Sequence, residues 1–197
     1  RLFPTYSGVN GPYLHLARIH RKRGELERAA AALSQLGNLN ETAYEVCRLE
    51  ADLRREMGDL AGAARALERT VFIHPYEISV HQELADLHSA LGAYEAAVQE
   101  RRAVVALDPV DRADAHYRLA HALLEAAHVE EAWREVLRAL EVAPNYEAAL
   151  ELLLEIRAEN RKASEPRNSH RPMRFSVCRR FAANSDFDRV STATSGS

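Results

Sequence analysis

The stretch that decides the fold lies near the middle of the chain, where residues 92–97 read GAYEAA and residues 106–109 read ALDP. Gly92 is the residue type that most often closes a helix in the left-handed conformation. The pair Asp108 and Pro109 ends a helix as well, because proline disfavours helical geometry in the residue before it. The interval 94–107 contains neither glycine nor proline and is predicted to be one helix.

The residues before Gly92 complete a hairpin. Val80, Leu84, Leu87 and Leu91 recur at the spacing of one helix face, which predicts a helix over residues 79–91. Two helices joined by a turn at Gly92 form an antiparallel pair. Such a pair approaches closely only where side chains are small, so Ala85 and Ala97 are predicted to be contact points between the two helices.

The same pattern recurs along the chain with a period of 34 or 35 residues. The residues that keep this register are Gly24, Gly58 and Gly92; Pro75, Pro109 and Pro144; Ala17, Ala51, Ala85 and Ala120; and Ala29, Ala63, Ala97 and Ala132. A fixed period of this length indicates a repeat architecture. We place the units at residues 10–43, 44–77, 78–112 and 113–146, with a lead-in at 1–9 and a capping helix at 147–160. In that helix Leu150, Leu153 and Leu154 are expected to cover the fourth unit.

Residues 92–97 and 106–109 resemble the second-helix signature of the tetratricopeptide repeat (TPR) family, and 58–75 and 129–144 resemble it too. The resemblance covers about residues 10–160. It implies an all-α, right-handed superhelical solenoid of antiparallel helix pairs, in which the first helix of each unit lines the concave surface. The bulky first-helix position, often Trp in the family, is occupied here by Tyr13, Cys47, His81 and His116.

The composition excludes several other classes of protein. The chain has 34 Ala and 24 Leu but only 17 Val and Ile together, which argues against an all-β or doubly wound fold. No run of 18 apolar residues could span a membrane. Two cysteines, Cys47 and Cys178, do not make a disulfide scaffold or a zinc ribbon.

The charge is divided unevenly along the chain. Residues 1–160 carry 18 basic and 26 acidic side chains, whereas residues 161–197 carry 8 basic and 3 acidic ones. The acidic body argues against nucleic-acid binding, which needs a basic surface. The basic segment 161–197 lacks the repeat pattern and is expected to be disordered. Within it, residues 173–183 combine apolar and basic residues, and a short amphipathic helix is the alternative.

The first helices of the units should present one stripe of side chains to the concave surface. By helical spacing these are Arg18, Arg21, Arg48, Asp52, Arg55, Gln82, Asp86, Tyr117 and His121. We predict a groove for a protein or peptide partner with acidic character near the first two units, where only Glu45 and Asp52 lie close to the arginines in sequence. The alternative interpretation is a solvated charged face.

One subfamily of these repeats holds the C-terminal carboxylate of chaperones with a lysine, asparagine and arginine set. The matching positions here are Leu14, Arg18, Leu49, Ser79 and Glu83, so the set is missing and that role is not expected. The nine histidines show no metal-ligand spacing. His81 and His116 are predicted to be packing residues, as is Cys47, and no metal or other cofactor is expected.

No nucleophile with a base, phosphate-binding glycine loop or catalytic carboxylate pair occurs, so we expect a non-catalytic interaction scaffold. The chain starts at Arg1, and we expect it to be a processed product or a piece of a longer protein. The alternative function is a C-terminal accessory module of a larger bacterial enzyme, because residues 2–4, 11–13 and 101–109 resemble repeat segments that follow metallopeptidase-like domains. A cytoplasmic location is the default, and an extracytoplasmic one the alternative.

Overall fold

A computed structural model describes residues 11–40 and 43–164, and within them it contains nine α-helices and no strand. The expected lead-in at 1–9 and residues 165–197 of the expected tail lie outside the described residues. The helices are α1 (Pro12–Lys22), α2 (Leu26–Leu39), α3 (Tyr44–Glu56), α4 (Leu60–Ile73), α5 (Ile78–Ala90), α6 (Tyr94–Ala106), α7 (Arg112–Glu125), α8 (Val129–Val142) and α9 (Glu147–Ser164).

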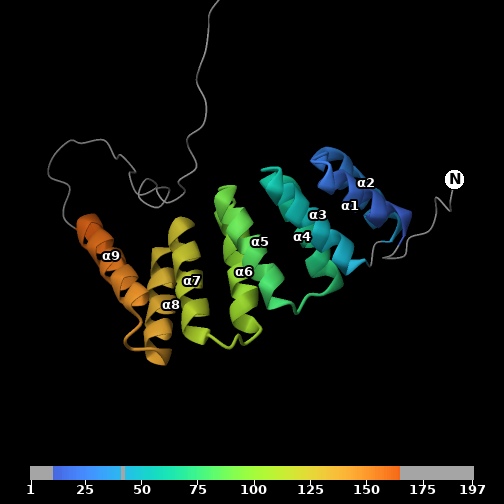
Figure 1. The fold of residues 1–197 in the computed structure, drawn as a ribbon. Helices are drawn as coiled ribbons and strands as arrows, with labels where there is room; N and C mark the ends of the chain where they lie inside the picture. The colour runs from blue at the N-terminus through green and yellow to red at the C-terminus, as the bar shows by residue number, and fades with distance from the viewer. Residues whose placement is uncertain (1–10, 41–42, 165–197) are drawn as a thin grey trace, which may run out of the picture.

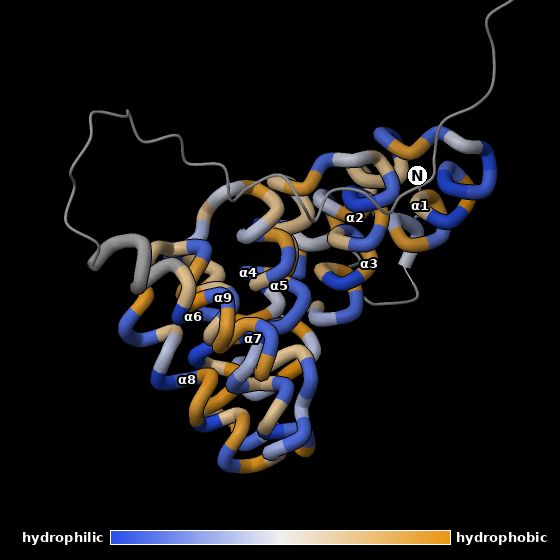
Figure 2. The backbone as a smooth tube through the Cα atoms, turned by 90° about the vertical axis from the view of Figure 1, so that its left-hand side faces the viewer, coloured by the Kyte–Doolittle hydropathy of each residue, from blue (hydrophilic) through white to orange (hydrophobic). Residues whose placement is uncertain are grey.

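The helices form pairs that lie side by side in one row, from α1 and α2 at one end to α9 at the other (Figure 1). Each helix packs against the next one in the chain. Hydrophobic and hydrophilic residues alternate along the helices (Figure 2), so each one buries a stripe. The apolar core therefore runs along the row, through clusters centred on Leu14 and Leu33, on Leu67 and Leu84, and on Leu123 and Val136. The predicted all-α array of helix pairs is confirmed.

Small residues define how closely the paired helices approach. The eight alanines of the repeat register are all buried, at 4% exposure or less: Ala17, Ala51, Ala85, Ala120, Ala29, Ala63, Ala97 and Ala132. Small buried residues at these positions are what close approach of two helices requires. Ala85 and Ala97 are both fully buried, which agrees with their predicted place between the two helices.

The turn inside each pair uses a residue with positive φ. Gly92 follows α5 with φ of 74°, and the Ala93 N–H donates to the His88 carbonyl oxygen at 2.8 Å, which closes the helix. Gly24 and Gly58 adopt the same conformation. In the fourth pair the equivalent residue is Ala127, with φ of 63°, a conformation that disfavours a residue with a Cβ atom.

The last helix differs from the prediction in length and in orientation. It runs four residues past the expected end at 160, and it buries Ala149, Leu152 and Ile156 against the fourth pair. Of the three leucines expected to cover that pair, Leu153 packs against it, whereas Leu150 and Leu154 are 41% and 65% exposed. The helix α9 continues the row as a further first helix. Its buried Ala149 and Ile156 occupy the positions of the buried Val80 and Leu87 in α5.

Candidate peptide-binding face

The nine predicted groove residues lie on the first helices α1, α3, α5 and α7, and none of them is fully buried. We call this set the first-helix face. Arg18, Arg21, Arg55 and Asp86 are exposed, and the other members, Arg48, Asp52, Gln82, Tyr117 and His121, are half-buried. Each side chain therefore keeps contact with solvent and is accessible to a ligand.

Ion pairs connect successive first helices. Arg48 Nη2 donates to Glu83 Oε1 at 3.0 Å, and Arg55 Nη2 donates to Glu83 Oε2 at 2.8 Å, so one carboxylate on α5 receives two guanidinium groups from α3. Arg21 on α1 donates to Glu56 on α3. Further along, Ser89 Oγ donates to a Glu125 carboxylate oxygen at 3.1 Å. These contacts tie α1 to α3, α3 to α5 and α5 to α7.

The expectation that few acids oppose these arginines is therefore wrong for Arg21, Arg48 and Arg55. Their carboxylate partners, Glu56 and Glu83, belong to the next unit along the chain, and only the stacking of the units brings them close. Burial lowers the pKa of Arg48, but the charge and hydrogen bond of Glu83 outweigh this, so the pKa is raised overall.

Other members of the first-helix face have no such partner. Arg18, Asp52 and Gln82 make no hydrogen bond or ion pair with the described part of the chain. Arg48 Nη1 is buried and has no acceptor there either. A buried donor without an acceptor is costly, and exposed polar groups are free to pair with a ligand.

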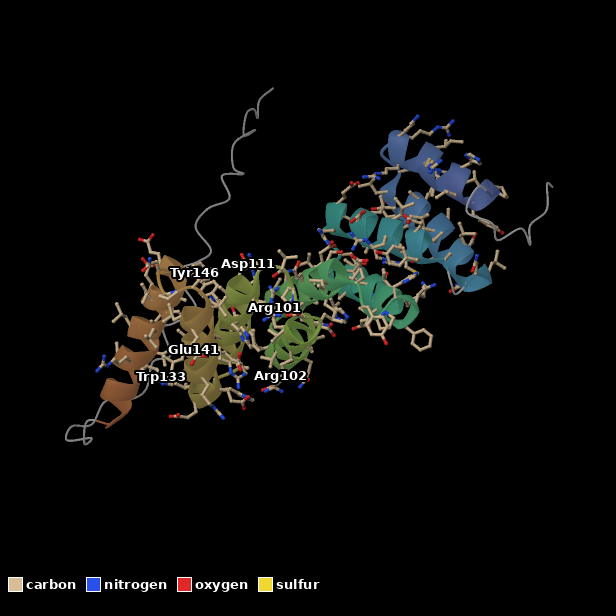
Figure 3. The ribbon with its side chains drawn as sticks, turned by 90° about the horizontal axis from the view of Figure 1, so that it is seen from below. Arg101, Arg102, Asp111, Trp133, Glu141 and Tyr146 are labelled. Atoms are coloured by element: carbon tan, nitrogen blue, oxygen red, sulfur yellow. The ribbon has the colours of Figure 1, made fainter. Side chains whose placement is uncertain are left out.

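Arg101 on α6 is a buried charged residue that sequence analysis missed. It is 7% exposed, and it donates to Asp86, whose side chain is 64% exposed. Burial lowers the pKa of Arg101. Figure 3 shows Arg101 toward Asp111 and Tyr146, with Arg102 on the other side of α6, where it pairs with Glu131 of α8 at 2.7 Å. The sequence alone could have pointed to Arg101, because the other three repeats have a buried apolar residue at the same position: Leu33, Leu67 and Val136.

Two tyrosines mark the end of the first-helix face at α9. The rings of Tyr117 and Tyr146 meet edge to face, with centroids 5.3 Å apart. The Tyr146 hydroxyl donates to Asp114 Oδ1 at 3.1 Å, and Arg118 Nε donates to Oδ2 of the same carboxylate at 2.6 Å. Burial and the bond to Asp114 raise the pKa of Tyr146 to about 12. A pocket of about 460 Å³ adjoins this group, lined by Asp111, Ala113, Asp114, Ala143, Pro144, Asn145 and Tyr146.

Comparison with solved structures agrees with this geometry. The crystal structure of MamA superposes with a TM-score of 0.58 at 16% identity, over 77% of this chain and 84% of that one. The first TPR of Spaghetti (RPAP3), bound to the HSP90 peptide SRMEEVD, gives 0.52 at 20% identity, over 62% and 96%. The first TPR domain of human RPAP3 gives 0.51 at 20% identity, over 64% and 99%. The fold is that of a TPR array.

No family model matches the chain, and no curated protein matches it. At such low identity the solved structures define the fold of this TPR array and nothing further. Within residues 11–40 and 43–164, no helix is long and apolar enough to cross a bilayer.

His81 and His116 contact the second helix of their own pair. His81 Nδ1 lies 2.6 Å from Glu100 Oε2, and its Nε2 lies 2.9 Å from the Pro75 carbonyl oxygen. His116 Nδ1 lies 2.7 Å from Glu135 Oε2, again 19 residues further along the chain. Among the described residues, no three His, Cys, Asp or Glu side chains are arranged to hold a metal. Cys47 is fully buried, as predicted, and burial raises the pKa of its thiol.

Proposed function

We propose that this TPR array is a protein-interaction scaffold whose first-helix face holds an extended peptide segment. Two observations together support the proposal. Ion pairs hold successive first helices against one another, and other polar side chains on the same face have no partner in the described chain. The pairs Arg48–Glu83 and Arg55–Glu83 fix one helix against the next before any ligand arrives. A receptor organised in this way loses little conformational entropy on binding.

The chemistry of the first two units favours an acidic segment. Arg18 has no counter-ion in the described chain, while Arg48 and Arg55 share the single carboxylate of Glu83. A guanidinium can hold a carboxylate through two parallel hydrogen bonds. An acidic side chain of the peptide would pair with Arg18 and compete with Glu83 for the two arginines of α3.

The proposed mode of binding differs from a clamp for a chaperone C-terminus. Of the positions that would supply the clamp, Leu14 is 1% exposed and belongs to the core. Glu83 places a negative charge where a terminal carboxylate would have to lie. We therefore propose recognition of internal acidic side chains, and we assign no catalytic step to the chain.

Fluorescence anisotropy tests the proposal with a labelled peptide of alternating glutamate and serine, compared with a peptide in which lysine replaces glutamate. We expect binding of the acidic peptide only, weakening with added salt. Each surface contact contributes about 0.2–1 kcal/mol, so Arg18→Ala with Arg48→Ala should weaken binding by about 2- to 30-fold and flatten the salt dependence. Glu83→Gln should strengthen binding, because it releases Arg48 and Arg55.

The matched control is Arg65→Ala with Arg134→Ala, which removes two exposed arginines from the second helices α4 and α8. It changes the net charge equally and should leave affinity unaltered. If the first-helix double variant binds as well as the parent at every salt concentration, the charged face only keeps the protein soluble.

A further inference from the structure

The outer face of α9 is a second candidate interaction surface, separate from the first-helix face. Ala149, Leu152 and Ile156 bury one side of α9 against the fourth pair. The other side presents a stripe that we call the α9 stripe: Glu147, Leu150, Leu154 and Arg157, all of them exposed. Figure 1 shows α9 as the last helix of the row.

The same positions are covered in the other units. In the first helices, the residues that correspond to Leu150 and Leu154 pack on the second helix of their own pair, and none is exposed: Tyr13 and Ala17, Cys47 and Ala51, His81 and Ala85, His116 and Ala120. Within the described chain, α9 has no second helix. Two large leucines are thus exposed on a face that is a helix–helix contact in every other unit.

Leu154 also limits what can cover this face. The four earlier units have alanine at that position, which lets the paired helices come close. A leucine holds a neighbouring helix at the wider separation of ordinary helix packing. The α9 stripe therefore suits a helix from outside the regular hairpin pattern.

The order of residues in the α9 stripe is self-complementary. Its members are spaced by three, four and three residues, which is the seam of a helix-to-helix contact. In an antiparallel pair centred on Leu152, Glu147 of one copy faces Arg157 of the other. Leu150 likewise faces Leu154. A parallel pair would instead oppose like charges at both ends.

We propose that a second copy of this chain docks antiparallel on the α9 stripe, forming a two-fold symmetric dimer. Symmetry repeats each contact, so two leucine contacts flank the axis and an ion pair closes each end. Neither Glu147 nor Arg157 makes an ion pair within the described residues. Glu151 and Glu155 lie near Tyr117, on the first-helix side, and remain outside the contact.

The α9 stripe provides four residues per copy. A standard interface uses roughly 20–30 residues per partner and buries about 1,200–2,000 Å², so this contact is small. We expect a dissociation constant on the order of 10–100 µM for the full chain. Sedimentation equilibrium over concentrations up to about 500 µM measures it. Leu150→Asp with Leu154→Asp should abolish the dimer. The control is Leu91→Asp, which changes another exposed leucine (44%), after α5, and should leave the dimer intact.

Charge reversal tests the antiparallel geometry at exposed positions that do not affect folding. Glu147→Arg alone or Arg157→Glu alone should each weaken the dimer by about fivefold or more, because like charges then meet at both ends. A mixture of the two single variants should form a heterodimer at least as well as the parent dimerises, since every end is then paired. The double variant should also recover dimerisation.

Three outcomes would overturn the proposal. They are a parent chain that stays monomeric at the highest concentration, a leucine double variant that still dimerises while folded, and single charge variants that fail to recover on mixing. If the parent is monomeric and dimerises only after Phe175→Ser with Phe181→Ser, the chain's own segment 173–183 covers the α9 stripe instead.

Discussion

Arg48 on α3 and Glu83 on α5 join two consecutive repeats, with Nη2 of the arginine 3.0 Å from Oε1 of the glutamate. The two residues are 35 positions apart, one repeat plus one residue. Arg21 and Glu56 keep the same separation. The contact between first helices is therefore itself periodic, and Arg21, Arg48 and Arg55 each pair with a carboxylate of the next repeat along the chain.

Neutralising Glu83 should loosen the second and third repeats. Glu83→Gln removes the charge that holds Arg48 and Arg55, whose side chains are 25% and 44% exposed. We expect a loss of about 1 kcal/mol in the free energy of unfolding, measured by urea denaturation. Glu68→Gln on α4, a carboxylate that is 53% exposed, is the control and should change stability by less. Equal effects of both changes would show that the tie between helices adds no stability.

The small residues between paired helices should not tolerate enlargement. Ala85→Leu or Ala97→Leu inserts three carbons where exposure is 0%, and should destabilise the array by about 1–3 kcal/mol through overpacking. Ala90→Leu, at an exposed position near the end of α5, is the control. Thermal melts in which neither buried variant loses stability would mean that the register of the repeat is assigned wrongly.

The hairpins could be predicted from sequence because their determinants are local. Gly92 and Ala85 each act within one pair, and a period of 34 residues repeats their signal. The ion pair of Arg48 with Glu83 could not be predicted, because the partners approach only when two units stack. The orientation of α9 was missed for the same reason. Leucines on two faces of that helix fit the helical period, and only the burial of Leu152, with Leu150 and Leu154 exposed, shows which face packs.

Ala127 offers a way to stabilise the fourth pair. Its φ of 63° strains a residue that has a Cβ atom, whereas the equivalent Gly92 adopts φ of 74° without that strain. Ala127→Gly should therefore raise the free energy of unfolding by about 0.5–1 kcal/mol. The neighbouring Ala126, with φ of −79°, is the control, because Ala126→Gly gains no such relief and should be neutral or destabilising. A melting temperature that falls for Ala127→Gly would contradict the strain argument.

The Tyr146–Asp114 hydrogen bond should make stability depend on alkaline pH. The folded chain holds the phenol proton until about pH 12, while an unfolded tyrosine loses it near pH 10. The bond's contribution is therefore fully present below pH 10 and is lost as the pH rises through 12. With Tyr146→Phe, the free energy of unfolding measured by urea denaturation should fall less between pH 10 and pH 12. Tyr76→Phe, at an exposed tyrosine, should preserve it, and equal pH profiles for parent and Tyr146→Phe would refute the effect.

Arg101 should be replaceable by leucine without loss of stability. Three other repeats bury an apolar residue at this position, and Arg101 is almost as buried as they are. Burial disfavours its charge, Arg118 adds repulsion, and Asp86 compensates from a largely exposed position. Replacing a buried charged group with a well-packed apolar residue is often neutral or stabilising, because the cost of burying the charge disappears. We therefore expect Arg101→Leu to match the parent or exceed it by about 1 kcal/mol in urea denaturation.

The change at the other end of this pair should have the opposite sign. Asp86→Asn removes the counter-charge of the buried Arg101 guanidinium, which should destabilise the array by about 1 kcal/mol, because solvent screens the exposed Asp86. In the double variant, Arg101→Leu should rescue most of that loss, because no buried charge then remains. A variant Arg101→Leu that is less stable than Asp86→Asn would show that the arginine contributes to the third repeat through packing of its long side chain rather than through its ion pair.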